Sequence, residues 1–222
     1  YDTPNIQEQE TIIPGMVTIE QIEERRLDWG EESAMYIASV LGRFPDNLED
    51  AIVPRSLLME AMVREIPAQG PAVLACDVAR FGADRTVVYR RQGGQCRMVW
   101  NVQGRDTQQV AGKLKAMAED DPDVDTVIVD DTGVNEETVR GGAVRVAAFN
   151  GGERARRPDR YVNAIAEAWM EMSQAFRDGI MDIDDNPALV AQLSSRRYII
   201  QGDRRIKLES KDDFKKRARS SP

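Results

Sequence analysis

The stretch Ala72-Val-Leu-Ala-Cys-Asp77 is an unbroken apolar run that ends in an acid. A half-exposed strand alternates apolar and polar residues, whereas a buried central strand is apolar throughout, so this run predicts a central strand. The stretch Thr126-Val-Ile-Val-Asp130 has the same form. The chain is therefore expected to contain two buried strands, each ending in an aspartate.

The segments around these runs predict the rest of the secondary structure. Two strand-like segments joined by the Gly93-Gly94 turn follow the first run, which implies an antiparallel meander of three strands. A helix precedes the second run, and a strand, two helices and a hairpin follow it. The expected ranges are strands 86–90, 97–102 and 143–149, helices 107–118, 158–177 and 186–193, and hairpin strands 197–201 and 204–208 around Gly202-Asp203.

This order of elements is that of a ribonuclease H-like α/β fold. Its five-stranded mixed sheet combines a three-strand antiparallel meander with two parallel strands, and helices flank the sheet. In that fold the crossover places the fourth strand parallel to the first and beside it. Asp77 and Asp130 should then meet at one edge of the sheet, where the strand ends of α/β folds usually build functional sites.

The first 66 residues are acidic and are expected to form short helices instead of strands. Residues 18–21, Thr-Ile-Glu-Gln, fit a capping box that opens a helix. Residues 31–41 are a second amphipathic run, and Pro54 suits the first turn of a third helix. We expect a helical linker over residues 1–66 and the sheet-containing domain over residues 67–222.

The composition restricts the chemistry that the chain can perform. It contains no histidine, which excludes serine–histidine and cysteine–histidine nucleophiles, histidine acid–base catalysis and the usual zinc sites. Its two cysteines, Cys76 and Cys96, lack metal-site spacing and suit reduced core thiols. No apolar run is long enough to span a membrane and no secretory signal is present, so a soluble cytoplasmic protein is expected.

Asp77 and Asp130 together indicate a divalent metal site. Two carboxylates held close together repel each other unless a cation lies between them. Ligation by oxygen alone favours Mg²⁺ or Mn²⁺ over zinc, and either ion can support phosphodiester hydrolysis without histidine. Each aspartate taken alone is equally well explained as a turn cap at its strand end. Asp131 is an additional candidate ligand, although its side chain should point the other way, and Asp84 is expected to cap the hairpin.

Charge is unevenly distributed along the chain, whose net charge is −8. An acidic total argues against binding nucleic acid, but the distribution of charge matters more than the total. Two basic clusters are candidate phosphate contacts, although such clusters also occur on ordinary solvated faces. The candidates for DNA contact are Arg196, Arg197, Arg204, Arg205, Lys207, Lys211, Lys215 and Lys216, and the second cluster is Arg154, Arg156, Arg157 and Arg160.

Five motifs, in order along the chain, resemble those of the nuclease domain of the large terminase subunit, part of the DNA-packaging motor of tailed bacteriophages. They are Ala75-Cys-Asp77-Val-Ala-Arg-Phe-Gly-Ala-Asp84-Arg-Thr-Val, Val127-Ile-Val-Asp130-Asp-Thr-Gly133-Val, Tyr161-Val-Asn163 leading to Ala166-Glu167-Ala-Trp169, Asp182-Ile-Asp-Asp-Asn-Pro-Ala-Leu, and Ile206-Lys-Leu-Glu209-Ser-Lys-Asp-Asp-Phe-Lys-Lys-Arg217. The segment Val40-Leu-Gly-Arg-Phe-Pro45 resembles the link between the packaging ATPase and the nuclease.

The resemblance implies a metal-dependent endonuclease that cuts concatemeric viral double-stranded DNA during genome packaging by two-metal in-line hydrolysis. It implies that Asp77 and Asp130 are catalytic metal ligands. The implied partners are the ATPase domain of the same polypeptide, the small terminase subunit and the portal protein. The protein would act in the host cell cytoplasm, transiently docked on the procapsid portal. Residues 1–66 would follow the ATPase domain, and no GxxxxGK[ST] phosphate loop of that domain occurs in this sequence.

The chain departs from the family pattern at two places. Where the family continues with glycines after the second aspartate, this chain reads Asn135-Glu-Glu-Thr-Val-Arg-Gly-Gly. The family's third acidic ligand follows a Ser-Pro dipeptide, and the sequence ends at Ser221-Pro222. We therefore expect the third ligand and the final helix of the domain beyond Pro222, with Asp212 and Asp213 as weaker candidates within the sequence.

Two other functions fit parts of the pattern. An actin-like ATPase or sugar kinase half shares the strand order, but residues 77–86 lack the compact glycine spacing of its phosphate loop. A catalytically silent docking module of the packaging motor would use the acidic N-terminal segment as its contact surface. Saturable ATP binding would favour the first alternative, and metal bound at Asp77 and Asp130 would argue against the second.

Overall fold

The computed structural model describes residues 4–8, 12–29, 31, 36, 40–41, 51–79, 85–130, 144–210, 213–214 and 216. Most of the helix predicted at 31–41 lies outside these residues, as do Asp84, Asp131, Lys211, Asp212 and Lys215. Contacts divide the chain into two units, Tyr1–Asp50 and Ala51–Pro222. The functional boundary between a linker over 1–66 and a nuclease domain over 67–222 stays a prediction.

Among its described residues, the first unit includes the helices α1 (Pro4–Gln7) and α2 (Ile19–Trp29). The capping box predicted at the start of α2 is confirmed. The backbone N–H of Gln21 donates to Thr18 Oγ1, and the N–H of Thr18 donates to Gln21 Oε1, both at 3.3 Å. This reciprocal pair satisfies N–H groups that the start of a helix otherwise leaves without partners.

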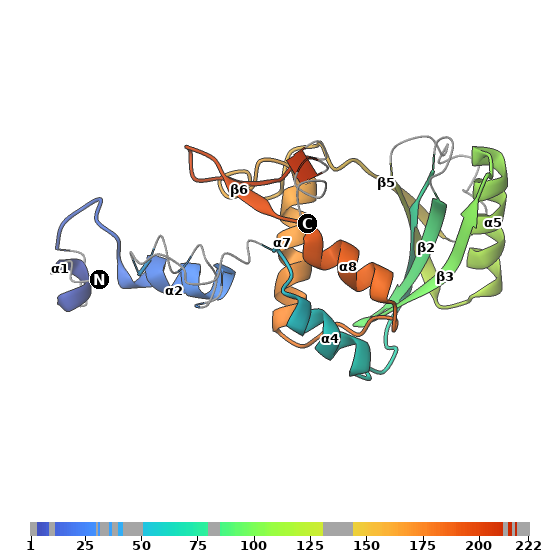
Figure 1. The fold of residues 1–222 in the computed structure, drawn as a ribbon, viewed down its shortest axis with the longest axis horizontal. Helices are drawn as coiled ribbons and strands as arrows, with labels where there is room; N and C mark the ends of the chain where they lie inside the picture. The colour runs from blue at the N-terminus through green and yellow to red at the C-terminus, as the bar shows by residue number, and fades with distance from the viewer. Residues whose placement is uncertain are drawn as a thin grey trace. The chain divides into compact units, whose positions relative to one another are not determined.

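The second unit contains the predicted five-stranded mixed sheet. Its strands are β1 (Ala72–Asp77), β2 (Arg85–Gln92), β3 (Gln95–Gln103), β4 (Val124–Asp130) and β5 (Arg145–Phe149). The order across the sheet is β3-β2-β1-β4-β5, with β1, β2 and β3 antiparallel and β1, β4 and β5 parallel (Figure 1). The crossover thus places β4 beside the central β1, which confirms the ribonuclease H-like topology.

Helix α5 (Thr107–Asp120) connects β3 to β4 and covers one face of the sheet (Figure 1). The Asp106 carboxylate begins the helix by accepting the backbone N–H of Gln109 at 2.8 Å. Alternate residues of the strands pack against the apolar stripe of α5. The residues of this core are Ala72, Leu74, Cys76, Val78, Val88, Val110, Ala111, Leu114, Ala118, Val124, Val127, Val129 and Val146.

The face of the sheet opposite α5 is less buried than the sequence predicts. The residues of β1 that point to α5 are buried, whereas Val73 is half-buried and Ala75 and Asp77 are exposed. The expectation of burial on both faces is wrong for β1, because successive residues of a strand point to opposite faces and α5 covers only one of them. The carboxyl end of β1 is therefore exposed on this second face of the sheet.

Further helices and a hairpin belong to the described part of the second unit. They are α4 (Arg55–Val63), α7 (Ala164–Arg177), α8 (Pro187–Ser195), β6 (Tyr198–Ile200) and β7 (Ile206–Leu208). Helix α4 packs against both α7 and α8, with Leu58 and Ala61 fully buried. The hairpin around Gly202-Asp203 is confirmed, with shorter strands than predicted. None of the described helices is long and apolar enough to cross a membrane.

Helix α7 begins six residues later than the sequence predicts, at Ala164 instead of Pro158. The Asn163 side chain caps the helix by accepting the backbone N–H of Ala166 at 3.2 Å. The preceding segment is used differently, because Tyr161 forms a parallel bridge with Ile206 of β7. The prediction of a helix over 158–163 is therefore wrong, since pairing with the hairpin competes with helix formation there.

The start of β3, an edge strand of the sheet, is paired with a segment that follows α7. The N–H of Cys96 donates to the Asp182 carbonyl at 2.8 Å, and the N–H of Asp182 donates to the Gly94 carbonyl at 3.0 Å. The buried Asp182 carboxylate also accepts the N–H of Ile66 at 3.0 Å and forms an ion pair with Arg97 at 2.6 Å. These contacts fasten the helical half of the unit to the sheet.

Replacing Gly94 by alanine is expected to destabilise the unit by about 1–3 kcal/mol. A Cβ on Gly94 would lie 2.2 Å from the Ile180 carbonyl oxygen, which is backbone and cannot rotate away. The matched control is Gly112→Ala on α5, where a Cβ meets nothing within 4 Å. That change should stabilise by about 0.5–1 kcal/mol, because alanine is the better helix former. Urea unfolding measures both, and equal midpoints for the two variants would contradict the close approach.

Candidate metal centre and basic surface

Asp77 and Asp130 end two neighbouring parallel strands. The parallel ladder pairs Cys76 of β1 with Val129 of β4, and the two aspartates are the next residues on each strand. Their Cα atoms therefore lie about 5 Å apart, the spacing of adjacent strands. Cys76 and Val129 point into the core under α5, so both carboxylates point to the opposite, open face. Asp77 is exposed and Asp130 is half-buried.

The placement of this pair follows from simple sequence features. In each strand, every second residue is apolar and points to α5, and this pattern determines the face on which the last residue lies. A shift of the strand register by one residue would turn the aspartates into the core. The structure thus brings together the two aspartates that were predicted to be neighbours. Their role as metal ligands stays a prediction.

The neighbouring cysteine is not a nucleophile. Burial, together with a smaller effect of the nearby Asp77 charge, raises the pKa of the Cys76 thiol to about 12. Burial and the Asp184 charge raise the pKa of the Cys96 thiol to about 11. Thiols with such pKa values stay protonated at neutral pH, and a protonated thiol neither attacks an electrophile nor binds a metal ion well. The candidate chemistry therefore belongs to the carboxylates.

The pair is not a complete metal site by itself. Within the described parts of the chain, no three acidic, histidine or cysteine side chains are grouped closely enough to hold an ion. Asp213 has another role, because its carboxylate accepts the Ser210 hydroxyl at 2.6 Å and its N–H donates to the same oxygen at 3.1 Å. The additional candidates Asp131 and Asp212 lie outside the described residues.

The two basic clusters of the sequence are neighbours in the structure. The N–H of Ile206 donates to the Arg160 carbonyl at 2.8 Å, and the N–H of Val162 donates to the Ile206 carbonyl at 3.0 Å. The segment around Tyr161 therefore lies beside β7 like an additional strand. The prediction of a helix over residues 158–163 did not allow for this proximity.

The basic residues predicted to contact DNA differ in their surroundings. The guanidinium of Arg196 lies over the rings of Trp169 and Phe214, 6.0 and 5.6 Å from their centroids, so its contacts are those of a packing residue. Arg205 forms an ion pair with Asp203 at 2.8 Å. The exposed members are Arg204, Lys207 and Lys216, Arg197 is half-buried, and Lys211 and Lys215 lie outside the described residues.

A buried acid holds the second basic cluster in place. Glu167, in the first turn of α7, is 3% exposed, and its carboxylate accepts the backbone N–H of Arg156 at 2.6 Å and Nε of Arg157 at 3.0 Å. Burial alone would raise the pKa of Glu167, but the hydrogen bonds and the positive charge of Arg157 outweigh it and lower the pKa. Glu167 is part of the Ala166-Glu167-Ala-Trp169 motif, but its burial and its contacts with the arginines were not predicted from the sequence.

The topology and the acidic ends of β1 and β4 define a ribonuclease H-like domain. Solved structures to which this chain is similar include nuclease domains of large terminase subunits. The domain from gp2 of bacterial virus Sf6 has a TM-score of 0.62 at 19% identity, over 76% of this chain and 91% of that chain. A point mutant of that domain, solved with manganese and beta-thujaplicinol, has a TM-score of 0.62 at 18% identity, over 75% of this chain and 91% of that chain.

The large terminase of a thermophilic bacteriophage has a TM-score of 0.52 at 13% identity, over 92% of this chain and 51% of that chain. No protein-family model and no curated protein matches the sequence. At these identities, the likeness to the terminase nucleases is a likeness of fold.

Proposed function

We propose that this chain is the nuclease domain of a large terminase subunit and that it hydrolyses phosphodiester bonds of double-stranded DNA with Mg²⁺ or Mn²⁺. The observation that carries the proposal is the placement of Asp77 and Asp130 on one open face at the carboxyl ends of adjacent strands. The fold that the chain shares with solved terminase nucleases supports it.

The residues present fit a divalent metal ion. Asp77 and Asp130 offer oxygen donors on one face, and a chain without histidine has few other means of activating water. Ions bound there would supply polarisation of the scissile phosphate and stabilisation of the leaving oxygen in an in-line, two-metal hydrolysis. The two carboxylates would hold and orient the ions, and Asp131 is an additional candidate ligand.

The biological setting is part of the proposal. The substrate would be concatemeric viral DNA, cut during genome packaging in the host cell cytoplasm. The ATPase domain of the same polypeptide, the small terminase subunit and the portal protein would be its partners. The basic residues of the hairpin would hold the DNA backbone, since phosphate contacts position a nucleic acid without reading its sequence.

The test is cleavage of supercoiled plasmid by the full-length protein. We expect nicking and linearisation with Mn²⁺ or Mg²⁺, and complete loss of both when EDTA removes the metal. Return of cleavage after dialysis against Mn²⁺ distinguishes metal removal from denaturation. Cleavage that continues in EDTA would refute the proposal. Saturable ATP binding without any cleavage would favour the actin-like alternative instead.

A docking module without catalysis is the second candidate. The absence of a third acidic ligand beside Asp77 and Asp130, within the residues that the structure describes, favours it for this chain alone. Calorimetry with Mn²⁺ separates the two functions, because a docking module has no reason to bind the ion at the two aspartates.

A further inference from the structure

The tip of the β6–β7 hairpin has a left-handed residue that is not glycine. The N–H of Gln201 donates to the Arg205 carbonyl and the N–H of Arg204 donates to the Gln201 carbonyl, both at 2.9 Å. These bonds leave a three-residue loop of Gly202, Asp203 and Arg204. Arg204 has a φ of 69°, and no other non-glycine residue of the described chain has a positive φ.

In this loop the arginine, and not the glycine, occupies the left-handed position. Three-residue hairpin loops normally end in a left-handed residue, and glycine is preferred there because it has no Cβ to strain. Here the glycine is Gly202, whose φ is not in the left-handed range and around which a Cβ would meet nothing within 4 Å. The left-handed position belongs instead to Arg204. Strained backbone of this kind tends to occur at functional sites.

The Arg204 side chain has no partner among the described residues, and it is exposed. The adjacent Arg205 differs, because Asp203 accepts both its Nε at 2.8 Å and its backbone N–H at 3.1 Å. These contacts lower the pKa of Asp203, so its negative charge persists and offsets that of Arg205. Of the two neighbouring arginines, Arg204 is the one whose charge is not compensated within the loop.

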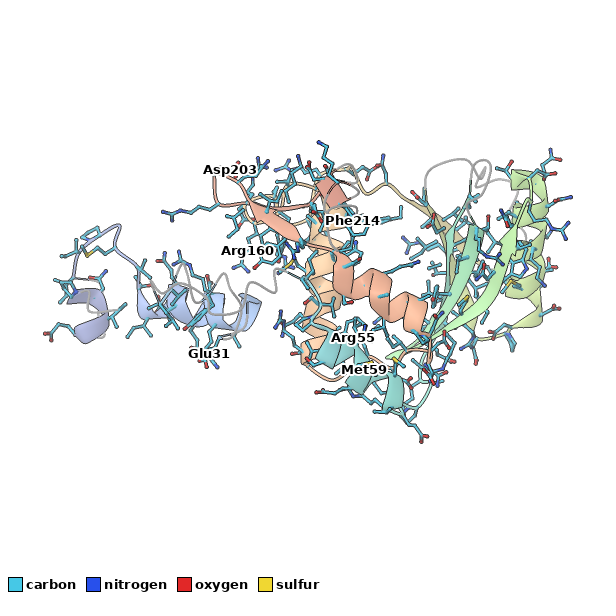
Figure 2. The ribbon with its side chains drawn as sticks, in the orientation of Figure 1. Glu31, Arg55, Met59, Arg160, Asp203 and Phe214 are labelled. Atoms are coloured by element: carbon cyan, nitrogen blue, oxygen red, sulfur yellow. The ribbon has the colours of Figure 1, made fainter. Side chains whose placement is uncertain are left out.

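Contacts with the segment around Tyr161 and burial of two of its residues stabilise the hairpin. Bonds between Ile206 and the segment around Tyr161 brace β7, and Ile206 and Leu208 are buried. Figure 2 shows Asp203 at the projecting end of the hairpin. A braced hairpin with an uncompensated arginine at its tip can present that arginine to a ligand at little further cost in conformational entropy.

We propose that the hairpin tip is a phosphate-contacting finger, in which Arg204 donates hydrogen bonds to a backbone phosphate of the DNA duplex. Guanidinium groups bind phosphate oxygens with two parallel hydrogen bonds. The strained backbone at Arg204 lowers the stability of the hairpin but places the guanidinium for this contact. The inference rests on the proposed DNA-cleaving function and names one contact of that function.

The test compares Arg204→Gly with the wild type in binding a fluorescent DNA duplex without divalent metal, across a series of salt concentrations. Loss of one phosphate contact should lower the slope of log affinity against log salt by about 0.9, and should weaken binding about eight-fold at about 0.1 M salt. The melting temperature of Arg204→Gly should equal or exceed that of the wild type, because glycine relieves the strain. In cleavage assays the variant should raise KM and leave kcat unchanged.

Two further variants make the result specific. Arg204→Lys keeps the charge and should keep the salt slope. Arg55→Gln removes one charge from exposed Arg55 on α4, away from the hairpin (Figure 2), and should leave affinity nearly unchanged. An unchanged affinity for Arg204→Gly, or an equal loss for Arg55→Gln, would overturn the finger while wild-type binding still upheld the nuclease. A wild type that does not bind the duplex would overturn both.

Discussion

Replacing Asp77 by asparagine is expected to reduce metal-dependent DNA cleavage by at least about 1,000-fold. Asparagine keeps the size of the side chain but removes the charge that holds a divalent ion. Loss of about 4 kcal/mol of transition-state stabilisation, typical when a catalytic metal is displaced, corresponds to this factor. Because Asp77 is exposed, the substitution should change the free energy of unfolding little. Asp130→Asn should behave similarly.

The matched control is Asp125→Asn. Asp125 is an exposed aspartate of the same sheet, near the start of β4 and thus at the far end of the strand from Asp130. The Asp125→Asn variant should cleave DNA as the wild type does. A second readout is the rise in melting temperature that Mn²⁺ produces by binding the folded state, which Asp77→Asn should lose and Asp125→Asn should keep. Wild-type cleavage by Asp77→Asn would remove the basis of the proposed function.

The second large effect is expected at Glu167. Replacing Glu167 by alanine should destabilise the unit by about 3 kcal/mol, since it removes two charge-assisted hydrogen bonds from a buried carboxylate. This loss of stability lies at the low end of the range for buried ion pairs, because Arg157 is 40% exposed and also contacts Glu171. Glu171→Ala is the control. Glu171 contacts the same two arginines from the solvent side, and its loss should cost at most about 1 kcal/mol.

The contribution of Glu167 to the free energy of unfolding depends on pH, and the direction of this dependence follows from the shift of its pKa. Folding lowers the pKa of Glu167 below its ordinary value of 4.5, because its hydrogen bonds to Arg157 and Arg156 outweigh the effect of burial. The stabilisation is therefore fully present above about pH 4.5 and is lost as the pH falls through the lowered pKa of the folded state. Urea unfolding of wild type and Glu167→Gln should converge in that acidic range. A difference that stays constant down to about pH 2 would show that the charge of Glu167 does not matter.

The sequence predicted the sheet because its signals are local. The apolar runs that end at Asp77 and Asp130 have the length and composition of buried strands. The short Gly93-Gly94 turn favours antiparallel pairing of β2 with β3. The handedness of parallel crossovers then determines that β4 lies beside β1. The proximity of Asp77 and Asp130 followed from these rules without further information.

The basic surface could not be predicted in the same way. Pro158 is a good first residue of a helix, and nothing nearby in the sequence shows that Tyr161 pairs with Ile206 instead. The burial of Glu167 likewise depends on the loop from Arg156 to Arg160 folding back onto α7. Both features rest on contacts between distant parts of the chain, which local propensity does not encode.

The segment after α7 also protects the molecule from self-association. β3 is nine residues long and lies at the edge of the sheet, where unpaired N–H and C=O groups invite a strand of another molecule. Asp182 and its neighbours occupy the beginning of that edge, and the ion pair between the buried Asp182 carboxylate and Arg97 holds them there. Weakening this ion pair would expose the edge of β3, to which a strand of another molecule could bind. Variants of Arg97 should therefore aggregate on heating at a lower temperature than the loss in their free energy of unfolding alone would predict.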